Sequence, residues 1–214
     1  MSSVAIIDYG MGNLHSIAKA VQHADSTVKV IVTDDPATIL GADRVVFPGV
    51  GAMRDCMAAL NARQLAPVLR EAAATRPVLG ICLGMQALLE ESEESPGTSS
   101  LGLIPGRVRR FADGLEDCHG QTLKIPHMGW NRVLPVAGHP VWQGIEPGSW
   151  FYFVHSYFAS PASQSDVAAT TDYPTPFASA LAHDNLFAVQ FHPEKSQAVG
   201  LRLLTNFLSW NPGS

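Results

Sequence analysis

Cysteine, clustered positive charge and long apolar segments are all scarce in this 214-residue chain. The three cysteines, Cys56, Cys82 and Cys118, are an odd number, and the N-terminus lacks a basic segment followed by a long apolar one. We therefore expect a reduced, cytoplasmic protein rather than a disulfide-stapled secreted one. The longest apolar runs fall short of the roughly 20 residues of a membrane-spanning helix, so we expect no membrane partner.

Positive charge and metal-binding clusters are sparse as well. The net charge is −5, and the densest basic group, Arg107, Arg109 and Arg110, is more typical of a solvated strand face than of a binding patch. Nucleic acid is therefore not expected as the main partner. Zinc needs three or four N, S or O ligands at workable spacing, and no such His/Cys cluster appears. We expect no metal and no cofactor.

The first half of the chain alternates strand-like and helical runs. With 46% hydrophobic residues, the chain can bury one sizeable core, and we expect one domain over residues 1–214. Strands are predicted at 4–8, 28–33, 44–48 and 77–81, and helices at 13–24, after Pro36, at 52–73 and at 86–90. Repeated βα units of this length require right-handed crossovers and a mostly parallel sheet.

The second half has a different pattern. Glycines and prolines divide residues 103–136 into short extended pieces, and an acidic start with Pro96 and Gly97 predicts a surface loop at 92–100. A long aromatic strand is predicted at 150–158, a hairpin at 177–191 and a final helix at 198–210. We therefore predict an α/β fold whose mostly parallel sheet is extended by antiparallel strands. Strand alternation predicts that about half of the aromatic residues at 150–153 are buried.

One cysteine stands between two glycines in the pentapeptide Gly80-Ile81-Cys82-Leu83-Gly84. This is the G-x-S-x-G nucleophile elbow with sulfur in place of oxygen, a strained strand-to-helix turn in which a Cβ at either glycine would clash with neighbouring backbone. The N-terminus of the following helix would favour the thiolate. We therefore expect Cys82 to act as a nucleophile on a carbonyl.

A candidate base lies 110 residues later, in Phe191-His192-Pro193-Glu194. In this interpretation His192 takes and returns the proton of Cys82, while Glu194 fixes the tautomer of His192 and supports its charged form. The alternatives are a surface turn with a solvated His192, or half of a metal site. The histidine alone favours a surface turn, whereas its combination with the elbow favours a Cys-His-Glu triad.

The glycine-rich turn at residues 47–51 suggests an oxyanion site. Its flexible peptides, at Gly49, Val50 and Gly51, can aim backbone N–H groups at a developing oxyanion, aided by the N–H of Leu83. The alternative is an ordinary glycine-rich βα turn. A dinucleotide-binding loop is disfavoured, because the third glycine of that fingerprint is absent.

Residues 80–86 and 191–194 resemble the class I (triad) glutamine amidotransferases. Four further segments occur in the same order in the glutaminase subunits of imidazole glycerol phosphate synthases: Asp-Tyr-Gly-Met-Gly-Asn at 8–13, Phe-Pro-Gly-Val-Gly at 47–51, Pro-His-Met-Gly-Trp-Asn at 126–131 and His-Ser-Tyr at 155–157. The resemblance spans residues 5 to about 208 and is weakest at 91–100 and 136–149.

This resemblance implies a flavodoxin-like three-layer fold and hydrolysis of glutamine through a γ-glutamyl thioester. It also implies a heterodimer with a (β/α)₈-barrel cyclase subunit, which uses the ammonia to make imidazole glycerol phosphate and an aminoimidazole carboxamide ribonucleotide in histidine biosynthesis. The implied substrate-binding residues are Gln86, Ser156 and Tyr157. The implied interface residues are Asn13, Trp130, Tyr152 and Lys195.

Two other interpretations stay open at this point. A glutaminase subunit for anthranilate, carbamoyl phosphate or pyridoxal phosphate synthesis would share Cys82, His192 and Glu194, but we would not expect it to carry the motifs at 8–13 and 126–131. A non-catalytic, flavodoxin-like binding or sensor protein with a cysteine elbow would leave the motif at 191–194 without a purpose.

Overall fold

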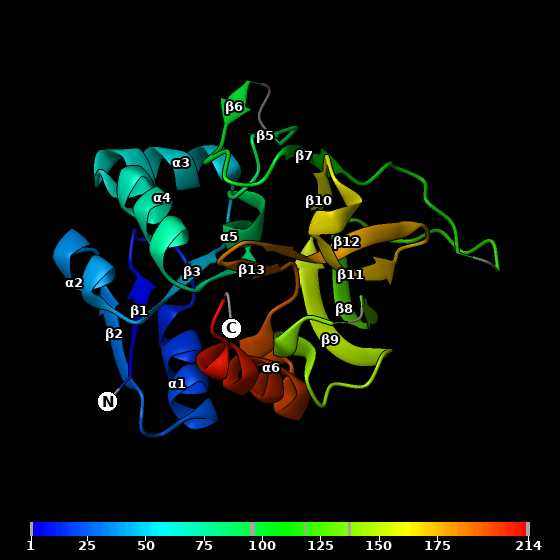
Figure 1. The fold of residues 1–214 in the computed structure, drawn as a ribbon. Coiled ribbons are helices and arrows are strands. Elements are labelled where there is room, and N and C mark those ends of the chain that lie inside the picture. The colour runs from blue at the N-terminus through cyan, green and yellow to red at the C-terminus, as the bar shows by residue number, and fades with distance from the viewer. Residues whose placement is uncertain (1, 95–96, 118, 137, 213–214) are drawn as a thin grey trace.

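The computed structural model describes residues 2–94, 97–117, 119–136 and 138–212. Its centre is a parallel sheet with the strand order β2-β1-β3-β4-β13 (Figure 1). The members are β1 (Ser3–Ile7), β2 (Lys29–Thr33), β3 (Arg44–Gly49), β4 (Val78–Cys82) and β13 (Leu186–Val189). β13 comes from the far end of the chain, yet it pairs in parallel with β4. The predicted parallel core is therefore confirmed.

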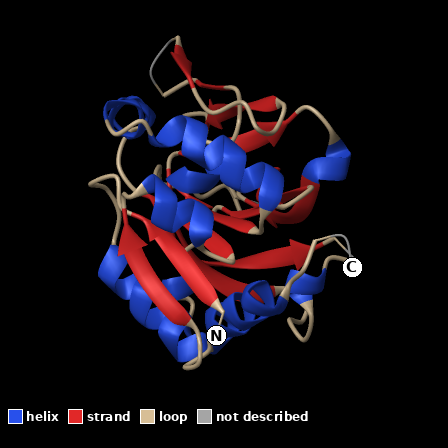
Figure 2. Cartoon of the chain, turned by 60° about the vertical axis from the view of Figure 1, so that its left-hand side comes forward, coloured by secondary structure: helices blue, strands red, loops and turns tan. Residues whose placement is uncertain are grey.

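Helices cover both faces of this sheet, which gives three layers (Figure 2). One face carries α1 (Leu14–Ala24) and α6 (Gln197–Ser209), which contact each other. The other carries α2 (Pro36–Gly41), α3 (Met53–Ala62), α4 (Leu65–Thr75) and the single turn α5 (Leu83–Gln86).

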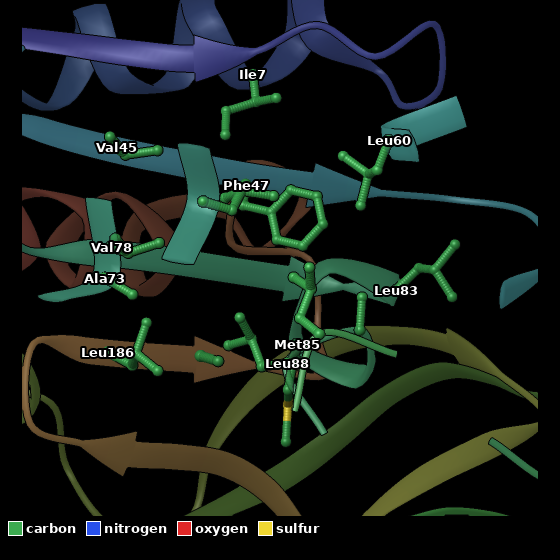
Figure 3. Close-up of a cluster of buried hydrophobic side chains, with 14 of the residues drawn as sticks. Ile7, Val45, Phe47, Leu60, Ala73, Val78, Leu83, Met85, Leu88 and Leu186 are labelled. Atoms are coloured by element: carbon green, nitrogen blue, oxygen red, sulfur yellow. The ribbon is translucent and has the colours of Figure 1, made fainter. Parts of the chain in front are cut away.

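Side-chain alternation along the strands separates two buried clusters. On β1, Ala5 and Ile7 join the cluster under α2 to α5, whereas Val4 and Ile6 join the cluster under α1 and α6. Successive strand residues point to opposite faces, so a strand covered on both sides is apolar throughout. Figure 3 shows the first cluster, in which Phe47 of β3 lies near Leu83 at the start of α5.

Mostly antiparallel strands extend the sheet beyond β13, with one parallel pair between β7 and β5. β12 (Pro176–His183) pairs with β13, and β10 (Tyr157–Pro161), β7 (Gly106–Arg110), β5 (Glu91–Ser92) and β6 (Thr98–Ser99) follow in that order. A branch from β12 runs through β11 (Val167–Asp172) and β8 (His127–Pro135) to β9 (Ser149–His155). The described residues also include the short 3₁₀ turns η1 (Pro140–Trp142), η2 (Gln164–Asp166) and η3 (Pro193–Lys195).

Four predicted segments differ from the structure by more than a residue or two at their ends. The helix expected at 52–73 is two helices, because Gln64 adopts a left-handed conformation (φ 56°) between α3 and α4. The helix expected at 86–90 is the four-residue α5, which begins directly after Cys82. The aromatic strand expected at 150–158 is interrupted at Ser156. In the described part of 92–100, the ends of the expected loop pair as the short strands β5 and β6, while residues 93–94 and 97 between them are turns as predicted.

The basic strand face is exposed. Arg107 and Arg110 are exposed on β7 and pair with Glu91 (3.2 Å) and Asp113 (2.9 Å), as expected for a solvated strand face. Within the described ranges, no helix is long and apolar enough to cross a membrane.

Candidate active site

Cys82 occupies a strained corner at the end of β4. Its φ is 55° and its ψ is −112°, an arrangement that L-residues rarely adopt. A Cβ on Gly84 would lie 2.0 Å from the carbonyl oxygen of Phe47, and one on Gly80 would lie 3.1 Å from the Cβ of Ala188. The close approach of β3 therefore requires glycine at 84, while position 80 is tight. The structure has the elbow that the pentapeptide predicts.

The helix after the elbow is shorter than expected. α5 has four residues, so the aligned peptide dipoles behind Cys82 are few, and the expected effect of the helix N-terminus on the thiolate stays a prediction. Any such effect comes from the first turn of α5. Leu83 is the first residue of α5, and the first N–H groups of a helix have no partner within it.

His192 lies on the segment that follows β13. Because β13 and β4 are parallel with Val189 opposite Ile81, the two strands bring His192 and Cys82 to the same edge of the sheet. The carboxyl ends of parallel strands are where open α/β sheets form their sites. The Nδ1–H of His192 donates to Oε1 of Glu194 at 2.8 Å. Both side chains are almost fully buried, with 4% and 2% exposed.

The electrostatics of His192 favour its charged form. Burial by itself lowers the pKa of His192, but the interactions with Cys82 and Glu194 outweigh it and raise the pKa to about 9. The Nε2 atom of His192 is buried and makes no hydrogen bond of normal geometry. This nitrogen is therefore the ring atom free to exchange a proton with the sulfur or a bound substrate.

Ser196 holds the histidine turn in place and was not expected from the sequence. Its hydroxyl donates to the carbonyl oxygen of His192 (2.7 Å) and accepts from the N–H of Tyr152 (3.1 Å), while the N–H of His192 donates to the carbonyl of Tyr152 (2.9 Å). A Cβ on Gly200 would lie 2.0 Å from the carbonyl oxygen of Pro193, so α6 packs directly against this turn.

A cavity of about 340 Å³ opens over Cys82 and His192. It is lined by most of the residues predicted for the oxyanion and substrate sites, namely Val50, Gly51, Leu83, Gln86, Ser156 and Tyr157. Gly49 is the exception, because it lines a smaller adjoining crevice. Ser156 and Tyr157 reach the cavity from the break between β9 and β10.

The side chain of Gln86 is buried and hydrogen-bonded within the protein. It is 5% exposed, and its Nε2 donates to the carbonyl oxygen of Tyr157 (2.8 Å) and to Oε1 of Gln190 (2.9 Å). Both N–H bonds are thus used within the protein, so its N–H groups are not available to a ligand. Gln190 in turn donates to the sulfur of Cys82 at 3.7 Å. Gln190 was missed because a glutamine within an apolar strand has no distinctive sequence signal.

Glu94 is a second residue that the sequence did not reveal. It was expected in a surface loop, but it lines the cavity, and its Oε2 accepts from the N–H of Met53 at 2.6 Å. That bond satisfies the first turn of α3, whose N-cap residue Ala52 provides no side-chain cap. Glu94 therefore places a carboxylate beside the glycine-rich turn.

A hydrogen bond from Tyr9 anchors the glycine-rich turn. The hydroxyl of Tyr9 donates to the carbonyl oxygen of Pro48 at 2.8 Å. A Cβ on Gly49 would lie 2.8 Å from both that hydroxyl and the N–H nitrogen of Gly84, so only glycine fits there. Gly51 has a φ of 92°, which also favours glycine.

The predicted interface residues lie together beside the site. The Trp130 and Tyr152 rings, on paired strands β8 and β9, are 6.1 Å apart, and the Nζ of Lys195 lies 5.7 Å from the Tyr152 ring centroid. Asn13 caps α1 and lines the small crevice together with Glu194 and Lys195.

Cys56 is less suited to the chemistry than Cys82. Cys56 is fully buried, and burial raises its pKa to about 11. Cys118 lies outside the described residues. Among the residues that are described, no three His, Cys, Asp or Glu side chains gather as a metal site would require.

Comparison with known proteins agrees with this geometry. A family model described as Glutamine amidotransferase class-I matches residues 5–210. A solved structure of a glutamine amidotransferase has a TM-score of 0.73 at 15% identity, covering 97% of this chain and 99% of that one, which shows a shared fold. Fold, cavity and family match together define a class-I glutamine amidotransferase.

More similar sequences narrow the class. The chain is 70% identical to the imidazole glycerol phosphate synthase subunit HisH of Methylococcus capsulatus, covering 100% of this chain and 99% of that protein. It is 58% identical to the subunit of the same name from Nitrosococcus oceani, covering 99% of each. The chain therefore belongs to the HisH family, the glutaminase subunits of imidazole glycerol phosphate synthase. This confirms the resemblance that the motifs predicted.

Proposed function

We propose that this protein hydrolyses glutamine to glutamate and ammonia and delivers the ammonia to a separate cyclase subunit in histidine biosynthesis. The observation that carries the proposal is the strained Cys82 at the floor of a cavity, beside a buried His192 that is hydrogen-bonded to Glu194. Membership of the HisH family supports it, and the match over residues 5–210 supports treating the chain as one amidotransferase domain.

In the proposed mechanism, the thiolate of Cys82 attacks the side-chain carboxamide carbon of glutamine. The tetrahedral oxyanion is stabilised by backbone N–H groups from Leu83 and the 49–51 turn. His192, whose pKa of about 9 keeps it protonated at neutral pH, gives its proton to the departing ammonia. The neutral imidazole then activates water, which cleaves the γ-glutamyl thioester and releases glutamate. Glu194 orients His192 and supports its charge.

The cavity offers a partner for the amino-acid end of the substrate. Glu94 provides a carboxylate for the α-ammonium group of glutamine, and Tyr157 and Ser156 form the facing wall. Gln86 contributes indirectly, because its amide N–H groups hold the backbone of Tyr157 and the side chain of Gln190.

We also propose that the peptide between Gly49 and Val50 turns over during activation. Tyr9 fixes the preceding carbonyl of Pro48, and Val50 is 42% exposed, so a rotation confined to this peptide would disturb little else. The resting chain would then point the wrong group at the oxyanion, and the docked partner would favour the active orientation.

The partner is proposed to be a (β/α)₈-barrel cyclase that forms a heterodimer with this chain. Ammonia is mostly ammonium in neutral water, so a consuming enzyme must dock close to the cavity. The β8–β9 surface supports this, since Trp130 (43% exposed), Met128 (65%) and Trp150 (50%) are exposed on these paired strands, and Lys195 lies against the neighbouring Tyr152 ring. Exposed aromatic residues of this kind are typical of protein interfaces. The free thiols of Cys56 and Cys82 support a cytoplasmic location.

The test is to purify the chain with a HisF-type cyclase and to measure glutamate release with and without the nucleotide substrate. We expect slow release by the isolated chain, activation in the complex, and loss of release in Cys82→Ala, while ammonia-dependent synthesis by the complex persists. Cys56→Ala is the matched control and should remain active. Full glutaminase activity in Cys82→Ala would refute the nucleophile, and full activity of the lone chain would refute the peptide flip.

A further inference from the structure

We propose that the side-chain NH₂ group of Gln190 donates a hydrogen bond that positions the sulfur of Cys82. Gln86, which is itself oriented by the backbone carbonyl of Tyr157, determines that the NH₂ group of Gln190, and not its oxygen, faces the sulfur. The inference rests on the proposed function in one respect, which is that Cys82 is the nucleophile. It assigns a role to a residue that lies outside the triad and outside the predicted substrate site.

The position of Gln190 is set by the sheet. It directly follows β13, and because Val189 lies opposite Ile81, Gln190 stands level with Cys82 on the neighbouring strand. The side chain is fully buried, and its Nε2 donates to the sulfur of Cys82 at 3.7 Å. The backbone N–H of Gln190 donates to the carbonyl of Ser179 (2.9 Å), so the residue is also held by its main chain.

The backbone carbonyl of Tyr157 determines how the Gln190 side-chain amide is oriented. The backbone oxygen of Tyr157 can only accept, so the group of Gln86 that lies 2.8 Å from it must be the NH₂ group. The same NH₂ group lies 2.9 Å from the Gln190 side chain, which must therefore present its oxygen there. It follows that the Gln190 NH₂ group faces the sulfur.

A pair of buried histidines holds the same carbonyl. The Nδ1–H of His155 donates to the Tyr157 oxygen (2.8 Å), so the Nε2 of neutral His155 accepts from Nδ1–H of His127 (2.9 Å), and His127 in turn accepts from the Nδ2–H of Asn131 (3.1 Å). Burial lowers the pKa of His155 to about 3 and that of His127 to about 4, so both rings stay neutral at physiological pH. The direction of each bond from Asn131 to Tyr157 is therefore fixed.

This arrangement suits a sulfur that carries charge. An amide N–H aimed at a thiolate is a charge-assisted bond, whereas an amide oxygen there would repel the sulfur. Hydrogen bonds to charged groups are stronger than neutral ones, and losing one typically changes an equilibrium by about tenfold to a hundredfold. Gln190 thus gives the thiolate an amide donor, and the hydrogen bond from Gln86 keeps that amide from turning over.

The experiment compares wild type with Gln190→Met, which keeps length and volume but has no donor. Alkylation of Cys82 by iodoacetamide is followed from pH 5 to 10 by peptide mapping. We expect the midpoint of the pH–rate profile to rise by about one to two pH units in the variant. In the cyclase complex, we expect kcat for glutamine hydrolysis to fall by about tenfold to a hundredfold with little change in KM.

Controls separate this role from a structural one. Gln143→Met makes the same change at an exposed position and should leave the alkylation midpoint unchanged. A merely structural Gln190 would lower the melting temperature without moving that midpoint. The other titratable groups around the sulfur and His192 are unchanged in both variants, namely Tyr9, Cys56, Glu94, His155, Tyr157, His192, Glu194 and Lys195.

A second variant and a direct readout cover the case in which Gln190→Met does not fold. Gln190→Glu still accepts from Gln86 but turns an oxygen toward the sulfur, so the midpoint should rise as well. In wild type, a side-chain amide proton of Gln190 should shift in the NMR spectrum when Cys82 is alkylated. An unchanged midpoint in a folded variant, or an unchanged amide resonance in wild type, would overturn the proposal. Alkylation needs no glutamine turnover, so a complex without glutaminase activity would refute the proposed function alone.

Discussion

Replacing Glu194 by glutamine keeps the size of the side chain but removes the charge that His192 faces. The two groups are 2.8 Å apart and almost fully buried, so water screens their interaction little. Burial opposes the charge on His192, and the interactions with Cys82 and Glu194 raise its pKa to about 9. An opposite charge at this distance typically shifts a pKa by about 1 to 3 units. We therefore expect the pKa of His192 in Glu194→Gln to fall by about that amount.

The raised pKa also predicts how stability depends on pH. The pKa of His192 is higher in the folded chain than its ordinary value of 6.5, so its contribution is fully present below about pH 6.5 and is lost as pH rises through about 9. That gap corresponds to roughly 3 kcal/mol of unfolding free energy, as an order of magnitude. In Glu194→Gln the contribution should be smaller and should disappear at a lower pH.

The assay is an NMR titration of the His192 ring together with urea unfolding between pH 6 and 10. Glutamine hydrolysis by the complex should lose activity at high pH earlier in Glu194→Gln, because His192 would deprotonate sooner. Glu146→Gln makes the same change at an exposed position and serves as the control. If His192 in Glu194→Gln still titrated near pH 9, the assignment of Glu194 as its electrostatic partner would be refuted.

Three further predictions test the elbow, the interface and the pocket. Gly84→Ala should prevent stable folding or lower the melting temperature strongly, because its Cβ would lie 2.0 Å from a carbonyl oxygen of β3. Gly41→Ala is the control and should be tolerated, because a Cβ at Gly41 would stand in open space. Equal melting temperatures of the two variants would contradict the close packing at Gly84. Trp130→Ala should weaken binding of the cyclase by about thirtyfold, or roughly 2 kcal/mol, in calorimetry, and unchanged affinity would remove it from the interface. A diazo-ketone analogue of glutamine should label Cys82 and spare the buried Cys56; equal labelling of both would show that the pocket gives no selectivity.

The sequence predicts the parallel core well because periodicity is a local property. Alternating apolar strands and amphipathic helices imply βα units, and right-handed crossovers leave few arrangements. The division between α3 and α4 was missed, since no glycine or proline marks it and the left-handed residue there is Gln64. The end of the aromatic strand at Ser156 was missed for a similar reason, because β10 pairs with β7, a partner about 50 residues away.

Some residues of the candidate site could be predicted from local sequence, and others could not. Cys82, His192 and Glu194 stand in short segments whose residue types have a chemical reason to occur together, so they could be predicted. Glu94 could not, because an acidic run is usually solvated, and only the packing of β5 beside β7 turns this residue toward the cavity. Gln190 is likewise recognisable only once β13 lies beside β4.

The parallel and the antiparallel parts of the sheet carry different parts of the proposed site. Parallel strands β4 and β13 end at one edge and supply the sulfur and the imidazole from positions 110 residues apart. The antiparallel strands then supply the wall of the cavity at Tyr157 and the exposed aromatic surface at Trp130. Asn131, next to Trp130, begins the hydrogen-bond chain that ends at the Tyr157 carbonyl, so direct hydrogen bonds connect the proposed docking surface to the cavity wall. A partner bound at β8 and β9 is thus linked to the cavity wall without contacting Cys82, which is compatible with the proposed flip of the 49–50 peptide.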